Sequence, residues 1–326
     1  MEETKNKIAI VVPYFGRLPE YIRSWIDSIK FNPDFDFIFF TNDVTINNYD
    51  LPENLKLNIT SFNQFSNLFR KKFDFKISLD EPYKLCDYRP AYGYVLNDYL
   101  RDYNYWGFCD IDLVFGDLSK YITEDILANN DRVYNLGHIS IFKNNFKMNT
   151  LFMKHVNFKD CLSYKYVFTH NFGFYFDETG VYKYGYGQGT VAQRLSDVRI
   201  YLDRQSADIK PGQYFMELFD TNEKVDYFEF DNGQLFSIKN SKRIKQYSYV
   251  HFQKRNLEVD SNLKENHFYI GPKNITSDKR KIIASLKTSN KVKFEKDKRK
   301  RLVNSKKKKF LQGALYYRLR MILHRI

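Results

Sequence analysis

The sequence has little cysteine and no long run of apolar residues. Only three cysteines occur among 326 residues, and none forms a Cys-x-x-Cys pair, so neither a disulfide framework nor a cysteine-rich zinc site is indicated. No apolar stretch approaches the roughly 20 residues that a membrane-spanning helix needs. No small-residue cleavage site follows the apolar segment 8–15, so we expect no signal peptide. These absences predict a cytoplasmic protein whose membrane contact is at most peripheral.

Positive charge is concentrated towards the end of the sequence. Residues 279–326 hold 18 basic and 2 acidic side chains, whereas residues 1–278 hold 34 basic and 37 acidic ones. A surface that binds nucleic acid carries Lys and Arg across the face that follows the phosphates, so we expect no nucleic acid on the main body. The basic segment predicts instead a contact with an anionic membrane surface or another polyanion.

Short apolar segments alternate with helical patterns through the first third of the sequence. Segments 8–12 and 35–40 are continuous apolar runs, typical of strands buried on both faces, and a further strand is expected at 105–109. Apolar residues recur at helical spacing over 18–29 and over 92–100. This order predicts an α/β fold with a central, mostly parallel sheet flanked by helices, whose ligands bind beyond the carboxyl ends of the strands.

The later sequence predicts further strands and one domain boundary. Strands are expected within 133–142, at 172–176 and within 227–252. Beyond Pro272 the composition shifts to lysine and polar residues. We therefore expect one domain over residues 1–272 and a basic helical tail over residues 273–326.

Two carboxylates stand two residues apart at the end of the strand expected at 105–109. Because strand side chains alternate, Asp110 and Asp112 point to the same face, where they are spaced to hold one hard cation such as Mn or Mg. An Asp-x-Asp pattern by itself is more often an ordinary solvated strand end. Its place at the carboxyl end of a strand in an α/β sheet favours the cation site.

Several segments, taken in order, resemble a known enzyme family. They are 8–43, 82–93 (PYKLCDYRPAYG), 106–117 (WGFCDIDLVFGD), 137–144 (GHISIFKN), 176–178 (FDE) and 250–254 (VHFQK). Together they are similar to bacterial polysaccharide glycosyltransferases with a GT-A-like fold and a DxD motif. The resemblance implies a hexosyltransferase-like enzyme that uses a divalent cation, Mn or Mg. It implies transfer of a sugar from a nucleotide-sugar donor, with UDP favoured, to a capsule or lipopolysaccharide glycan.

The resemblance also implies roles for side chains outside the Asp-x-Asp pair. His251 stands at the place in the order of motifs where GT-A enzymes often have a histidine that reaches the metal or the diphosphate. The alternative is a half-buried histidine that bonds to a backbone carbonyl. Asp87 would contact the donor nucleotide, and Lys84 or Arg89 would offset phosphate charge. An acidic residue at a helix start, paired with an arginine, explains Asp87 and Arg89 equally well.

Asp177 and Glu178 are the candidate carboxylates for the reacting centre. One of them would accept the proton of the acceptor hydroxyl, or orient that hydroxyl in a retaining reaction. As neighbours in an expected strand they point opposite ways, so at most one reaches the centre, with Asp177 slightly favoured. His138 either lines the acceptor side or is an ordinary turn histidine.

The final segment 310–326 repeats leucine and isoleucine at helical spacing, with arginine on another face. This basic amphipathic pattern predicts a peripheral anchor on the inner face of the cell membrane, near a lipid-linked glycan acceptor. A helix that docks on its own core or on a dimer partner is the alternative.

Two other functions stay open at this point. A sugar-nucleotide nucleotidyltransferase would share the α/β architecture and the paired carboxylates, but it usually has a glycine-rich phosphate loop after the first strand. Residues 13–17 (PYFGR) hold a single glycine, which counts against that function. A non-catalytic polyanion-binding protein would use the basic tail as its arm.

Overall fold

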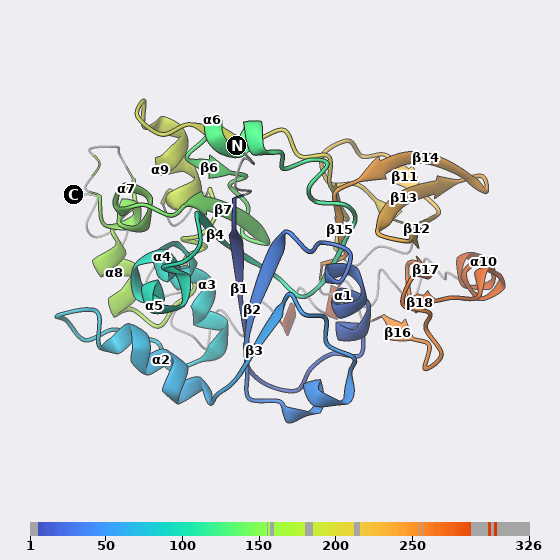
Figure 1. Ribbon diagram of the computed structural model, residues 1–326, viewed down its shortest axis with the longest axis horizontal. Helices are drawn as coiled ribbons and strands as arrows, with labels where there is room; N and C mark the ends of the chain where they lie inside the picture. Colours follow the sequence, from blue (N-terminus) through green and yellow to red (C-terminus); the bar gives the residue numbers. More distant parts are fainter. Residues whose placement is uncertain are drawn as a thin grey trace, which may run out of the picture.

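A seven-stranded sheet forms the centre of the fold (Figure 1). The structure, a computed structural model, describes residues 6–154, 156, 160–179, 185–211, 216–253, 255, 257–287, 299–300 and 303–304. In spatial order the strands are β3 (Leu55–Ile59), β2 (Phe35–Thr41), β1 (Ile8–Tyr14), β4 (Tyr105–Cys109), β7 (Ile139–Lys143), β6 (Arg132–Val133) and β8 (Ile200–Tyr201). The first four are parallel and β7 is antiparallel to both of its neighbours, so the expected mostly parallel sheet is confirmed.

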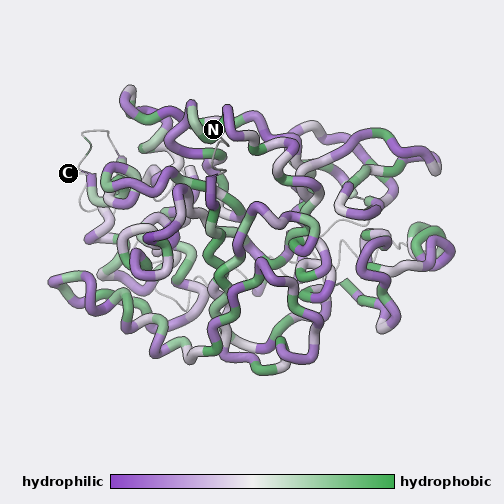
Figure 2. Tube along the Cα trace, in the orientation of Figure 1, coloured by the Kyte–Doolittle hydropathy of each residue, from purple (hydrophilic) through white to green (hydrophobic). Residues whose placement is uncertain are grey.

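Helices cover both faces of this sheet because its strands are apolar on both sides. The α-helices of the fold are α1 (Ile22–Ile29), α2 (Phe62–Arg70), α3 (Leu85–Tyr88), α4 (Tyr92–Val95), α5 (Asn97–Leu100), α6 (Glu124–Asn129), α7 (Phe146–Asn149), α8 (Tyr164–Thr169), α9 (Gln188–Arg194) and α10 (Lys279–Lys287), which packs on a second sheet. Trp25 of α1 is fully buried against one face, and Phe69 of α2 is fully buried on the other. Figure 2 shows hydrophobic stretches along the central strands and more hydrophilic stretches in the outer loops.

The helix expected over 92–100 is interrupted. Leu96 has φ −98° and ψ 23°, which is not helical, and it separates α4 from α5. The strand expected at 172–176 is wrong: the structure assigns no strand there, and the segment bonds to a buried carboxylate instead of a neighbouring strand.

A second sheet lies at the end of the molecule away from α2 to α5 (Figure 1). Its order is β14 (Lys242–Tyr247), β13 (Gln234–Lys239), β12 (Tyr227–Asp231), β17 (His267–Ile270), β18 (Asn274–Thr276) and β16 (Glu258–Val259). The strands expected within 227–252 are thereby confirmed. Two smaller sheets join β5 (Leu113–Phe115), β15 (Tyr249–His251) and β9 (Ala207–Asp208), and β10 (Met216–Glu217) with β11 (Lys224–Val225).

The second sheet continues past the expected boundary at residue 272. β18 pairs with β17, and α10 packs beside them through Ile282, which is fully buried. The division at residue 272 stays a prediction, and the amphipathic segment 310–326 lies outside the described residues. Within the described part of the chain, no helix combines the length and apolar character needed to cross a membrane.

Candidate metal and donor site

The Asp-x-Asp pair lies directly after β4, at the carboxyl edge of the parallel strands. The backbone N–H of Asp110 donates to the carbonyl of His138 at 2.9 Å, which extends the pairing of β4 with β7 by one residue. The carbonyl of Asp112 accepts from the N–H of Phe252 at 3.1 Å. Backbone bonds to neighbouring strands therefore fix both residues where α/β folds bind their ligands.

The small sheet of β5, β15 and β9 brings a histidine and a third carboxylate to this edge. In its register His251 lies opposite Leu113 on one side and beside Asp208 on the other. The Nδ1 atom of His251 is 2.9 Å from Oδ1 of Asp208, and its Nε2 atom is 3.4 Å from Oδ1 of Asp112. The structure therefore brings His251 to the Asp-x-Asp pair, as the order of the motifs suggested.

Sequence reasoning missed Asp208. It belongs to β9, a strand of two residues, which is too short to give a periodic pattern. Its place depends entirely on the pairing of β9 with β15, a contact between residues 43 positions apart in the sequence.

These side chains form a group that fits a divalent cation. Ligand atoms of Asp110, Asp112 and His251 all lie within 4.8 Å of one another, and so do those of His138, Asp208 and His251. The first set offers two carboxylates and one imidazole, and the carboxylate oxygens suit Mn or Mg. Burial would lower the pKa of His251, but hydrogen bonds and charge from Asp112 and Asp208 outweigh burial and raise the pKa to about 10. The negative charge of Asp112 and Asp208 would also stabilise a bound metal ion.

His138 lies directly against His251. The two rings stack with centroids 4.1 Å apart at 27°, and Nε2 of His138 is 3.1 Å from the hydroxyl of Tyr249. Burial, followed by the charge of His251, holds the pKa of His138 well below its ordinary value. His138 is therefore a buried neutral ring that supports His251, whereas a role on the acceptor side stays a prediction.

Arg89 connects the Asp-x-Asp segment with the candidate catalytic carboxylates. Its Nη2 atom pairs with Asp110, its Nη1 atom lies 3.0 Å from Oδ2 of Asp177, and Nη1 also donates to the carbonyl of Gly137. Burial opposes the charge of Arg89, but the neighbouring charges, with Asp110 first and Asp177 among the others, together outweigh burial, so the pKa of Arg89 lies above its ordinary value. Arg89 is thus a fixed cation at the edge of the site, and its contact with a donor phosphate stays a prediction.

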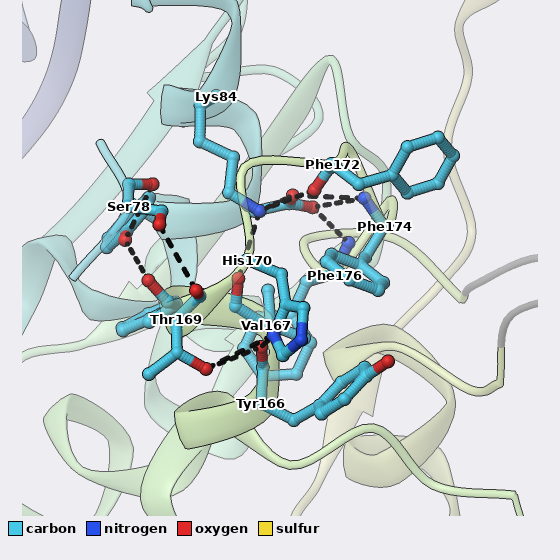
Figure 3. Close-up of polar contacts among 12 residues, drawn as sticks. Ser78, Lys84, Tyr166, Val167, Thr169, His170, Phe172, Phe174 and Phe176 are labelled. Carbon is cyan, nitrogen blue, oxygen red and sulfur yellow. Dashed lines mark hydrogen bonds and ion pairs between the residues drawn. The ribbon is translucent and has the colours of Figure 1, made fainter. Parts of the chain in front are cut away.

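Lys84, shown with its partners in Figure 3, forms a buried ion pair with Asp87. Their side chains are 4% and 2% exposed, and Nζ of Lys84 is 2.8 Å from Oδ2 of Asp87. Lys84 also donates to the carbonyls of Val167 and Phe172, while Asp87 accepts from the N–H of Phe174 and from a second N–H two residues later. The polar atoms of this pair are therefore bonded within the protein, and the donor contacts implied by the resemblance stay predictions.

Asp177 and Glu178 follow each other in a turn, not in the strand that was expected, and they differ in burial. Asp177 is buried beside Arg89, and burial raises its pKa well above the ordinary value despite that cation. Glu178 is exposed, and its carboxylate lies so close to Gly137 that a Cβ atom there would be 2.3 Å from Oε1. Of the two residues, Glu178 is exposed and Asp177 is buried.

Comparisons with known proteins give a family and a set of broadly similar structures. The profile of a protein family described as a family of unknown function (DUF6625) matches residues 10–279. A search of curated proteins returns no match. Among solved structures, the glycosyltransferase GlyE of Streptococcus pneumoniae TIGR4 is 15% identical with a TM-score of 0.24, covering 43% of this chain and 34% of that chain. This chain thus spans about a third of the length of GlyE.

A second similar structure covers more of the chain. The galactosyltransferase LgtC, in complex with donor and acceptor sugar analogs, is 10% identical with a TM-score of 0.35, covering 76% of this chain and 88% of that chain. These similar structures are glycosyltransferases. Both TM-scores are below 0.5, so these similarities carry no conclusion about activity.

Proposed function

Because this chain belongs to the family of unknown function DUF6625, its activity has to be inferred from its own site, and we propose that it is a divalent-cation-dependent glycosyltransferase. The observation that carries the proposal is the convergence of Asp110, Asp112 and His251 at the carboxyl edge of the parallel strands. The ordered motifs of the sequence, which resemble bacterial polysaccharide glycosyltransferases, support the same reaction class.

The chemistry of a nucleotide-sugar donor explains why these residues are needed together. A departing nucleoside diphosphate carries at least two negative charges, which two aspartates alone would repel. Asp110, Asp112 and His251 would hold Mn or Mg, which would act as a Lewis acid and stabilise the charge that develops on the diphosphate. Arg89 supplies a permanent positive charge beside Asp110.

The acceptor side of the proposed site is formed by Glu178. Its exposed carboxylate lies against Gly137, whose carbonyl accepts a hydrogen bond from Arg89. We assign Glu178 to the acceptor hydroxyl, as the base or as the group that orients it. Asp177, which sequence reasoning slightly favoured, is buried and paired with Arg89, so its proposed role is to position Arg89.

Lys84 and Asp87 support the acceptor side through the backbone. The N–H groups of Phe174 and Phe176 donate to Asp87, which fixes the chain immediately before Asp177 (Figure 3). The pair thereby supports the segment that carries the two candidate carboxylates.

The proposed acceptor is a lipid-linked capsule or lipopolysaccharide glycan at the inner face of the cell membrane. The support is the excess of 18 basic over 2 acidic residues between 279 and 326. Because Ile282 of α10 packs in the fold, a truncation that tests the anchor should begin after Lys287. Loss of flotation with phosphatidylglycerol vesicles, with donor hydrolysis intact, is the expected result; unchanged flotation would contradict it.

Donor hydrolysis and transfer with UDP-, GDP- and CMP-sugars, with and without Mn, test the activity. We expect cation-dependent release of one nucleoside diphosphate, and at least a hundredfold loss in Asp110→Ala and Asp112→Ala. Asp117→Ala is the matched control, because Asp117 follows in the same segment and caps a local turn through the N–H of Lys120. Full activity in both aspartate variants would refute the metal assignment, and release of pyrophosphate would indicate a nucleotidyltransferase.

A further inference from the structure

The imidazole of His251 is held on three sides. Asp208 lies 2.9 Å from its Nδ1 atom, the ring of His138 stacks on its face at 4.1 Å, and Asp112 lies 3.4 Å from its Nε2 atom. His251 itself is only 7% exposed. The ring therefore has one orientation in which one nitrogen faces the Asp-x-Asp segment and the other faces away.

We propose that Asp208 is a positioning residue that fixes His251 with its Nε2 lone pair directed at the cation site. The inference rests on the proposed function, because it assumes that Asp110, Asp112 and His251 share one cation. An imidazole ligand is metallated through one nitrogen, and the hydrogen bond of the other nitrogen decides which one. The N–H at Nδ1 donates to Asp208, which leaves Nε2 for the cation.

Asp208 is in turn fixed by its neighbours. The amide Nε2 of Gln253 donates to Oδ1 of Asp208 at 2.7 Å, so this oxygen receives two hydrogen bonds. The N–H of Ile209 donates to the carbonyl of His251 at 2.9 Å and continues the β9–β15 pairing. Gln253 has a φ of 40°, a left-handed conformation that costs a non-glycine residue about 1 kcal/mol or more. The fold keeps this strained residue where its side chain reaches Asp208.

The geometry indicates that Asp208 positions His251 and does not itself bind the cation. Asp208 contacts the nitrogen of His251 that points away from Asp112, since Nδ1 and Nε2 lie on different sides of the ring. The set of Asp110, Asp112 and His251 Nε2 is thus complete without it. A carboxylate that bonds the far nitrogen of a metal-bound histidine typically changes metal affinity 10- to 100-fold.

Titration of the full chain with Mn²⁺, followed by electron paramagnetic resonance of the free ion, measures this effect without an activity assay. We expect Asp208→Ala to weaken Mn²⁺ binding 10- to 100-fold and Asp208→Asn, which keeps an acceptor oxygen for Nδ1–H, to restore part of that loss. Asp220→Asn is the control: Asp220 is a nearby carboxylate, 47% exposed and paired with Arg204, and its removal should leave binding unchanged.

The outcomes distinguish this inference from the proposed function. Equal Mn²⁺ affinity in wild type and both Asp208 variants would overturn the positioning role while the metal site stands. Loss of binding in Asp208→Asn as complete as in His251→Ala would make Asp208 a ligand and would also overturn it. A wild type that binds no Mn²⁺ would overturn both proposals. Urea unfolding of Asp208→Asn checks that the isosteric variant keeps its fold.

Discussion

The Nη1 atom of Arg89 lies 3.0 Å from Oδ2 of Asp177, and this ion pair connects two segments that are 88 residues apart in the sequence. The second guanidinium nitrogen of Arg89 pairs with Asp110. The planar guanidinium group of Arg89 thus sets the separation between the proposed cation site and the proposed acceptor side. Lysine offers one point charge instead of a fork, so it would not hold both carboxylates in the same geometry.

Arg89→Ala is expected to destabilise the protein by about 3 kcal/mol, because it leaves the carboxylate of Asp177 buried without its cation. Urea unfolding measures this change. Adding Asp177→Asn to Arg89→Ala should recover part of the loss, since a neutral amide then replaces the buried carboxyl group that has lost its cation. Equal stability of the single and double variants would show that the Arg89–Asp177 pair does not carry the effect.

Lys84→Met distinguishes a positioning role from a direct contact with the donor. Loss of the cation leaves Asp87 buried and unpaired, so we expect a stability loss of about 3 kcal/mol in urea unfolding. The dissociation constant for Mn²⁺ should stay within twofold of wild type. Lys165→Met, which removes an exposed lysine on α8, is the control and should change neither quantity. Weakened donor binding at unchanged stability would instead favour a direct phosphate contact.

The sequence predicted those parts of the fold that depend on local pattern. The apolar run from Ile8 and the run from Phe35 became β1 and β2, and the strand at Tyr105–Cys109 matches β4 exactly in its bounds. Strong periodicity of buried residues accounts for this agreement. The strand prediction for segment 172–176 was wrong. Its aromatic residues alternate as they would in a strand, but its backbone N–H groups bond to Asp87.

The sequence could predict only those site residues whose place follows from the order of the motifs. Asp110 and Asp112 stand beside a strand that the sequence reveals, and His251 could be matched by order. Asp208 and the stacking of His138 on His251 depend on the pairing of β9, β15 and β7 with distant strands. Such long-range register has no signal in a single sequence, because a two-residue strand shows no period.

The buried carboxyl group of Asp27 on α1 predicts that the free energy of unfolding depends on pH. Burial, only partly opposed by Arg23, raises the pKa of Asp27 from 3.8 to about 7. Its contribution to stability is therefore fully present below about pH 4 and lost as the pH rises through 7. Asp27→Asn removes this dependence, so relative to wild type it should gain stability between pH 5 and pH 8, by at most about 4 kcal/mol.

Urea unfolding at pH 5, 6, 7 and 8 measures this difference between wild type and Asp27→Asn. Asp98→Asn, which changes a side chain that is 82% exposed and does not act on Asp27, is the control and should follow the wild-type curve. Parallel curves for Asp27→Asn and wild type would contradict the prediction, because they would mean that the Asp27 carboxyl has the same pKa in the folded and unfolded chain.

Gly137→Ala tests the proposed acceptor side without removing any polar group. The new Cβ atom would lie 2.3 Å from Oε1 of Glu178, so the flexible carboxylate must move while the backbone stays in place. Because a displacement of about 1 Å can cost as much as 10²-fold in rate, we expect at least a tenfold loss of transfer with Mn²⁺ affinity and urea stability near wild type. Gly173→Ala is the matched control, since its nearest neighbour, Tyr83, is 4.0 Å from the added atom. Unchanged transfer in Gly137→Ala would mean that the place of the Glu178 carboxylate does not matter for the reaction.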